Sequence, residues 1–88
     1  MKCVMFYEVA PGGLEKAREN FPGHRARIDE FHARGELLMV GTWANPAEGA
    51  LAVFSNREAA EAFAKGDPFV LNGVVGTWTL RDWNEVLV

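Results

Sequence analysis

The sequence predicts an α+β domain in which a four-stranded antiparallel sheet carries two helices on one face. Runs of β-branched, aromatic and aliphatic residues alternate with helical stretches in the order strand, helix, strand, strand, helix, strand. Only a short turn separates the two middle strands, so they are expected to form a hairpin. This order is the ferredoxin-like βαββαβ pattern, and the 88 residues form one domain, residues 1–88.

The first strand is expected at Cys3–Val9, which is rich in β-branched and aromatic residues and stops at a Pro-Gly-Gly loop. Residues Leu14–Asn20 could form a short helical turn. Pro22 interrupts it, and proline suits the first turn of a new helix. We therefore expect the main first helix to run from about Pro22 to Arg34, with Gly35 ending it.

The second and third strands are expected at Glu36–Trp43 and Ala50–Phe54, joined by a turn over residues 44–49 that contains Asn, Pro and Gly. Ser55 followed by Glu58 has the spacing of a capping box, which predicts that Ser55 is the N-cap of the second helix.

The second helix is expected to end at Lys65–Gly66, with Gly66 in a left-handed conformation. The last strand is expected at Gly73–Asp82, followed by a C-terminal tail.

The strands are apolar at consecutive positions, as in Val4-Met5-Phe6 and Leu37-Leu38-Met39-Val40, which predicts burial on both faces of the sheet. Two helices can cover only one face. The other face would be a large exposed apolar patch, so we expect a homodimer with the sheets packed face to face.

Composition excludes several classes of protein. Hydrophobic residues make up 49% of the chain and charged residues 24%, which is typical of a folded domain rather than a disordered one. The net charge is -3 and the basic residues are scattered, so neither nucleic acid nor a membrane is an expected partner. A single cysteine, Cys3, and an N-terminal apolar run too short for a signal peptide predict a cytoplasmic protein.

Asp67 lies between the end of the second helix and Pro68, and this proline favours an extended conformation for the residue before it. Its side chain could cap the short turn at 69–72, or it could pair with His24. At about 100° per residue, His24 shares a helix face with Ile28 and Phe31 and should face the sheet. The alternative is that His24 is a core histidine bonded to a backbone carbonyl. His32 falls at the border of this face and should be half-exposed.

Other chemistries find little support in the residues. Cys3 and Ser55 have structural roles, and no nucleophile-elbow pattern occurs. The two histidines do not share a helix face and no cluster has metal-ligand spacing, so we expect no metal. No glycine-rich loop lies between a strand and a helix as a phosphate or dinucleotide site requires, so we expect no cofactor.

Three aromatic residues could form the walls of a small-molecule pocket. Tyr7, Trp43 and Phe69 are the candidates for substrate binding, and Tyr7 adds a hydroxyl group. Aromatic residues at strand ends are also common core or interface anchors, and this alternative stays open.

The chain resembles the YciI-like (YCII-related) domain family. The resemblance rests on Pro22–Ile28, Gly35–Gly41, and Asp67-Pro68-Phe69 followed by Gly73-Val74, and it spans nearly the whole chain. It implies a dimeric α+β barrel in which the helix histidine and the aspartate of the Asp-Pro-aromatic motif form an acid–base pair at a pocket. Those positions are His24 and Asp67. It also implies elimination or isomerisation chemistry on ring compounds.

The chain departs from the family pattern at three places. Gly41-Thr42 stands where the family often has Gly-Pro, Phe69 stands where it often has Tyr, and the turn after Trp43 is short. These departures leave the class of substrate open.

Two functions are therefore expected. The first is a cofactor-free enzyme that uses His24 and Asp67 for proton transfer on a small, cyclic or aromatic molecule. The alternative is a non-catalytic dimeric module that binds a small molecule or regulates a partner. A cofactor-independent or heme monooxygenase shares the fold, but fold alone does not determine function.

Overall fold

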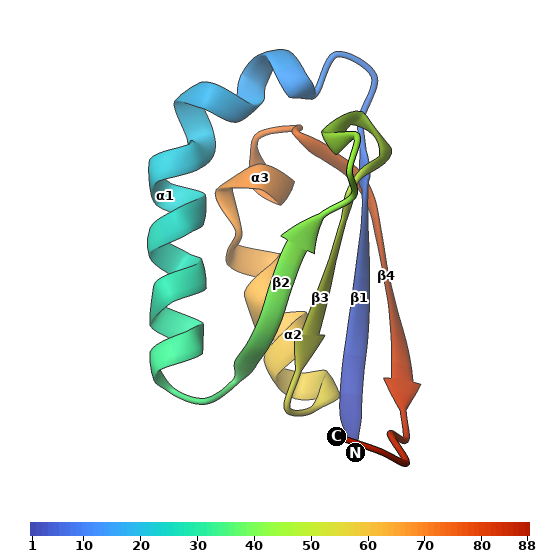
Figure 1. The fold of residues 1–88 in the computed structure, drawn as a ribbon. Coiled ribbons are helices and arrows are strands. Elements are labelled where there is room, and N and C mark those ends of the chain that lie inside the picture. The colour runs from blue at the N-terminus through green and yellow to red at the C-terminus, as the bar shows by residue number, and fades with distance from the viewer.

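A computed structural model describes residues 1–88 (Figure 1). Its elements are, in chain order, β1 (Lys2–Val9), α1 (Leu14–Ala33), β2 (Leu37–Thr42), the 3₁₀ turn η1 (Pro46–Glu48), β3 (Ala50–Phe54), α2 (Arg57–Gly66), α3 (Pro68–Leu71) and β4 (Val75–Trp83). The strands form one sheet in the order β2-β3-β1-β4, and every neighbouring pair is antiparallel. The predicted ferredoxin-like α+β fold is confirmed.

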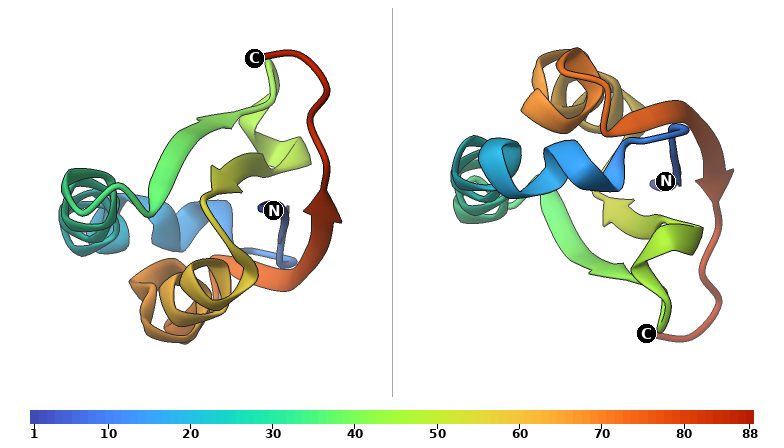
Figure 2. Two further views of the ribbon diagram at one scale, coloured as in Figure 1. Left: turned by 90° about the horizontal axis from the view of Figure 1, so that it is seen from below. Right: turned by 90° about the horizontal axis from the view of Figure 1, so that it is seen from above.

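The three α-helices lie on one face of the sheet, and the sheet curves away from them (Figure 2). Alternate residues of β1 point toward the helices, and Cys3, Met5 and Tyr7 are buried there. Met5 lies opposite Ala52 of β3 and Leu80 of β4. Directly opposite residues share a face, so the register decides which side chains meet the helices.

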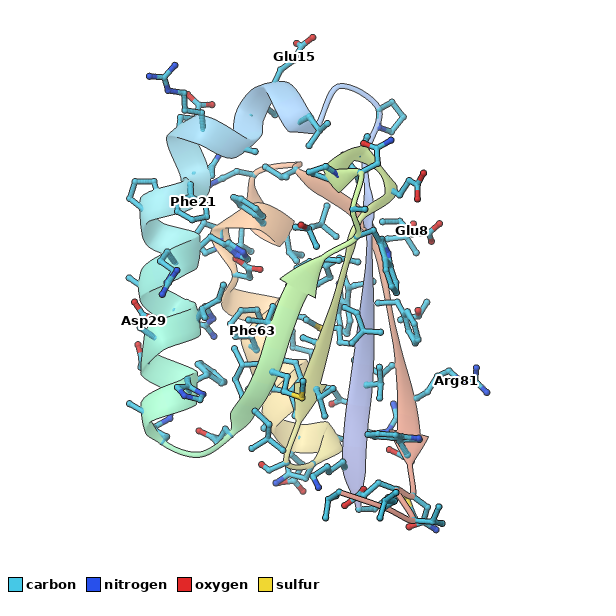
Figure 3. The ribbon with its side chains drawn as sticks, in the orientation of Figure 1. Glu8, Glu15, Phe21, Asp29, Phe63 and Arg81 are labelled. Carbon is cyan, nitrogen blue, oxygen red and sulfur yellow. The ribbon has the colours of Figure 1, made fainter.

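The centre of the core is Phe63 of α2, which is 2% exposed. Its ring meets Phe31 of α1 edge-on, with centroids 5.2 Å apart, and it lies 5.4 Å from the ring of Phe54 of β3. Figure 3 shows Phe63 between α1 and the sheet. Because this ring joins three elements, its truncation to alanine would cost about 3–5 kcal/mol.

The prediction for the first helix was wrong about its start. α1 begins at Leu14 and contains Pro22 in its interior. Proline has no N–H group to donate to Arg18, so the helix loses one bond there and bends. In Figure 1 the segment before the bend crosses the end of the sheet, and the segment after it runs beside β2. α1 is therefore a single bent helix, and Pro22 does not start a second one.

The predicted cap of the second helix was displaced by one residue. Asn56 is the N-cap of α2, and its Oδ1 accepts a hydrogen bond from the backbone N–H of Ala59 at 2.8 Å. Ser55 instead continues the strand, because its backbone N–H donates to the carbonyl of Glu36 at 2.9 Å. Asparagine and serine cap about equally well, so strand pairing decides between them.

Gly66 is the last residue of α2 and does not adopt the expected left-handed conformation. A Cβ atom at this position would overlap the guanidinium of Arg27. Arg27 Nε donates to the carbonyl of Phe63 at 3.0 Å, and Nη2 donates to that of Ala62 at 2.8 Å. Gly66 is therefore explained by the side chain that crosses it, and Arg27 ties α1 to the C-terminal end of α2.

The strand boundaries differ from the predictions by one or two residues. β2 begins at Leu37 and ends at Thr42, and β4 begins at Val75 and ends at Trp83. Gly73 has a φ of 82° and makes the left-handed turn that precedes β4. None of the helices combines the length and the apolar character needed to cross a bilayer.

Candidate active site

Asp67 is fully buried between α2 and α3, and its backbone is extended, as Pro68 predicts. Its Oδ1 accepts hydrogen bonds from His24 Nδ1 at 2.8 Å and from the backbone N–H of Phe69 at 3.1 Å. Its Oδ2 accepts one from the hydroxyl of Tyr7 at 2.7 Å. The sequence left capping and pairing with His24 as alternatives, and Asp67 does both.

The Asp67 carboxylate accepts a hydrogen bond in each of its three contacts. An ionised aspartate can accept all three bonds, and hydrogen bonds to a charged group are the strong ones. A buried charge requires such partners, because an unpaired one would destabilise the fold by several kcal/mol. The carboxylate of Asp67 is therefore fixed in position from three separate elements, β1, α1 and α3.

His24 is 9% exposed and lies on the same helix face as Ile28 and Phe31, as the sequence predicts. Its Nδ1 must donate to Asp67, so the neutral ring carries its proton on Nδ1 and leaves Nε2 as an acceptor. His24 Nε2 has no hydrogen-bond partner in the chain. Every buried side-chain nitrogen or oxygen atom does have a partner, so Nε2 is not a buried atom. Nε2 is therefore open to solvent.

The plane of the His24 ring is fixed by aromatic neighbours. Phe69 stacks on it with centroids 3.7 Å apart and planes 3° from parallel. Phe63 approaches its edge at 6.4 Å, and Phe21 lies 6.2 Å away on the same helix. With Asp67 holding Nδ1 and Phe69 holding the face, the direction of Nε2 is set before any ligand arrives.

Tyr7 is buried, and burial is the main cause that raises the pKa of its hydroxyl well above the ordinary value. The neighbouring Asp67 carboxylate raises that pKa further, both by its charge and by accepting the hydrogen bond. The hydroxyl stays protonated at neutral pH and acts as a fixed donor to Asp67.

A cavity of about 360 Å³ lies between α1 and the sheet. Ten of its fourteen lining residues are hydrophobic; the lining is Met5, Tyr7, Phe21, His24, Arg25, Ile28, Val40, Gly41, Thr42, Ala50, Leu51, Ala52, Phe63 and Phe69. The buried members, such as Met5 and Phe63, form its floor. Exposed members from α1 and from the edge strand β2, such as Phe21 and Val40, form its mouth. This size and character are typical of small-molecule sites.

Of the residues expected at the site, Tyr7, His24 and Phe69 line this cavity, and Asp67 lies behind His24. Trp43 does not line it, so a part for Trp43 in substrate binding stays a prediction. Thr42 lies opposite Ala50 on the helix-facing side of the sheet, and the next residue of an extended chain points to the other side. His32, expected to be half-exposed, is exposed, and its Nδ1 donates to the carbonyl of Leu37 at 2.8 Å.

Sequence reasoning missed two polar residues of the cavity, Arg25 and Thr42. Arg25 follows His24 directly, but adjacent helical residues point about 100° apart, so helical periodicity does not predict that both reach one cavity. No three His, Cys, Asp or Glu side chains gather as a metal site would require.

Solved structures with the same fold include 5-chloro-2-hydroxyhydroquinone dehydrochlorinase (TftG) from Burkholderia phenoliruptrix AC1100 in complex with 2,5-dihydroxybenzoquinone. It aligns with a TM-score of 0.75 and 18% identity over 96% of this chain and 94% of its own. A variant of MhuD with two manganese protoporphyrin IX molecules per active site aligns with a TM-score of 0.51 and 16% identity over 99% and 95% of the two chains. At these identities the likeness shows the fold alone.

Sequence comparison identifies relatives of the chain. The chain is 30% identical to protein YciI of Escherichia coli O6:H1 over 97 aligned positions, which cover 98% of this chain and 99% of YciI. The same values hold for YciI of Shigella flexneri and for a protein of Haemophilus influenzae. Residues 1–84 match the YCII-related domain. The chain therefore belongs to the YCII-related domain family.

Proposed function

We propose that this protein is a cofactor-free enzyme that transfers protons on a small ring compound, in an elimination or an isomerisation. The observation that carries the proposal is the 2.8 Å hydrogen bond between His24 Nδ1 and Asp67, which leaves Nε2 open beside a mostly apolar cavity. This is the arrangement that a general base or acid requires.

In this mechanism His24 Nε2 takes a proton from a carbon or hydroxyl of the ring. The electron pair of the broken bond forms a new double bond, and in an elimination the leaving group departs with its own bonding pair. Asp67 stabilises the imidazolium that forms, because it already accepts the Nδ1 proton. In an isomerisation, the imidazolium returns the proton to another atom of the ring.

The cavity supports a ring as substrate. Its apolar walls offer burial to a flat molecule, and the roughly 360 Å³ volume lies at the lower end of typical ligand pockets. TftG, a protein of the same fold, is named as a dehydrochlorinase of a hydroxyhydroquinone, which is an elimination on a ring. That likeness supports the class of reaction by analogy only.

The alternative is a module that binds a small molecule without converting it. The same cavity supports this function, and the Tyr7, Asp67 and His24 contacts would then be a satisfied polar part of the core. Only the open Nε2 favours catalysis, since a structural histidine has no need of a free nitrogen beside a cavity.

We further propose that the protein acts as a homodimer in the cytoplasm. The face of the sheet away from the helices carries Val4, Phe6, Leu51 and Met39, and no helix covers it (Figure 2). Met39 is 69% exposed. A second copy packed on this face would remove that apolar surface from water, and burial of this kind commonly stabilises chains of this size.

Solvent exchange is the experiment that tests the proposed function. The protein is mixed in deuterated water with a panel of hydroxylated, halogenated and keto ring compounds, and loss of carbon-bound proton signals is followed by NMR. A proton-transfer enzyme should accelerate exchange or conversion of at least one class of compound. A binding module would broaden or shift ligand signals and leave the exchange rates unchanged.

A further inference from the structure

Arg25 is the one permanently charged residue that lines the cavity. Tyr7 is held neutral by its raised pKa, and the other polar groups of the lining are His24 and Thr42. The Arg25 side chain is 61% exposed and lies at the mouth, one residue after His24 on α1. An otherwise apolar cavity with a single cation at its entrance is complementary to an apolar molecule with one negative group.

The guanidinium of Arg25 is available for a ligand. Its Nε donates to Asp29 Oδ1 at 3.1 Å, and both side chains of this pair are more than half exposed. An exposed pair four residues apart on a helix contributes little stability. It also occupies only one of the five N–H donors, so the two terminal nitrogens can bind an oxyanion while Nε keeps Asp29.

Arg27, two residues after Arg25, makes structural contacts that Arg25 does not make. Its Nε and Nη2 both donate to backbone carbonyls of α2, and its guanidinium lies over the ring of Phe31 at 4.8 Å. That arginine is committed to holding two helices together. Arg25 has no such structural contacts and is turned toward the cavity.

We propose that the site takes a small organic anion, a ring compound that carries a carboxylate, phenolate or enolate oxygen. The oxyanion binds the terminal nitrogens of Arg25 at the mouth, and the ring lies along the apolar walls toward His24. The hydroxyl of Thr42, which also lines the cavity, is a further donor for the oxyanion. As a substrate class, such an anion rests on the proposed function for the reaction that it undergoes. Its binding at Arg25 does not depend on that function.

Besides Asp29, which accepts a hydrogen bond from Arg25 Nε at the mouth, the opposing charge near the site is Asp67. It lies behind His24, and its oxygens are already occupied by three donors. An anion in the cavity therefore meets the imidazole ring before it meets the carboxylate. His24 separates the two negative charges, and a protonated His24 would attract both.

Calorimetric titration with benzoate and with benzamide tests the proposal, because the two probes share a ring and differ in charge. We expect wild-type protein to bind benzoate at least tenfold more tightly than benzamide. Arg25→Gln should weaken benzoate binding about tenfold and leave benzamide binding unchanged. Arg18→Gln is the matched control, because Arg18 is exposed on the same helix and does not line the cavity.

Equal affinity of wild-type protein for both probes, or no binding of either, would overturn the proposal. So would a preference for benzoate that survives in Arg25→Gln, or one that is lost equally in Arg18→Gln. A preference that depends on Arg25, in a protein that accelerates no proton exchange, would uphold the anion site and reject the proposed enzyme. Exchange activity without any preference for anions would uphold the proposed enzyme and reject the anion site.

Discussion

Gly23 lies directly against Pro68, and a Cβ atom at position 23 would come within 3.1 Å of the proline Cγ. This contact joins α1 to α3 one residue before His24 and one residue after Asp67. The contact between these two helices therefore lies beside the hydrogen bond that joins His24 to Asp67. Pro22-Gly23 reads as a helix start in the sequence, but in the structure it bends α1 and lets it reach α3.

Gly23→Ala should shift His24 relative to Asp67 by a few tenths of an ångström without unfolding the protein. Alanine favours a helix over glycine by about 1 kcal/mol, which offsets much of the cost of the close contact. We expect a melting temperature near the wild-type value and a loss of proton-exchange activity, because α1 must move away from α3. Thermal melting and the exchange assay measure the two effects.

The second variant Gly23→Ala/Pro68→Ala serves as the control. It removes the Cγ atom and leaves only the ordinary contact with Cβ at 3.8 Å. Activity should recover at least in part, although loss of the proline itself costs up to about 1 kcal/mol. Full activity in the single variant Gly23→Ala would show that the contact does not position His24.

Phe69→Leu tests the stacking on His24. Leucine keeps most of the apolar volume but has no flat face, so the stacking contribution of about 0.5–1.5 kcal/mol is lost. We expect a small drop in melting temperature and a larger drop in exchange rate, since the ring of His24 can then rotate about its remaining bond to Asp67. Phe69→Tyr keeps the ring and should retain activity. Equal activity of the leucine and tyrosine variants would contradict the account.

Tyr7 is the only tyrosine in the chain, so its titration can be read from tyrosinate absorbance. Its folded pKa is raised above the ordinary value of 10.0, so its contribution to stability is complete below pH 10 and is lost as the pH rises further. Above pH 10, the unfolding free energy of the wild type should fall relative to Tyr7→Phe, by up to about 1.4 kcal/mol per pH unit. Tyrosinate absorbance should appear only with unfolding. Its appearance near pH 10 in folded protein would contradict the buried hydrogen bond to Asp67.

Much of the fold could be predicted from the sequence, because strand-forming runs and short turns are local signals. The hairpin between β2 and β3, the antiparallel sheet and the helix face that carries His24 all followed from such signals. The errors arose where two local rules competed. Pro22 can start a helix or bend one, and Ser55 and Asn56 can both cap one. Tertiary contacts made the choice in each case.

The candidate site was predictable only in part. The periodicity of α1 and Pro68 placed His24 and Asp67 but left their pairing as one alternative, and the resemblance to the YciI-like family implied the bond between them. The bond from Tyr7 to Asp67 could not be predicted, since it depends on how far β1 extends beneath α3. Trp43 does not line the cavity, because it follows Thr42, and the place of Thr42 opposite Ala50 puts Thr42 on the helix-facing side of the sheet.

The proposed dimer predicts that wild-type protein sediments at twice the 9.7 kDa chain mass at micromolar concentration. Met39→Glu should convert it to a monomer, because Met39 is 69% exposed on the face without helices. Leu71→Glu is the matched control, since Leu71 is 64% exposed on α3. Sedimentation equilibrium of the three proteins decides the matter, and a folded wild-type monomer would reject this interface.

We propose that the pair of His24 and Asp67 moves protons rather than merely stabilising the fold. His24→Gln and Asp67→Asn keep the size of each side chain and its capacity to hydrogen-bond, but neither amide exchanges a proton near neutral pH. His32→Gln is the control, because His32 is an exposed histidine on the same helix.

The most direct measurement is the deuterium exchange rate of the compound that the NMR screen identifies, with the melting temperature of each variant taken alongside. We predict at least a hundredfold loss of rate in His24→Gln and Asp67→Asn, little change in melting temperature, and wild-type behaviour in His32→Gln. Variants that lose about 1–3 kcal/mol of stability but exchange at the wild-type rate would contradict this prediction, and would leave the binding module as the function.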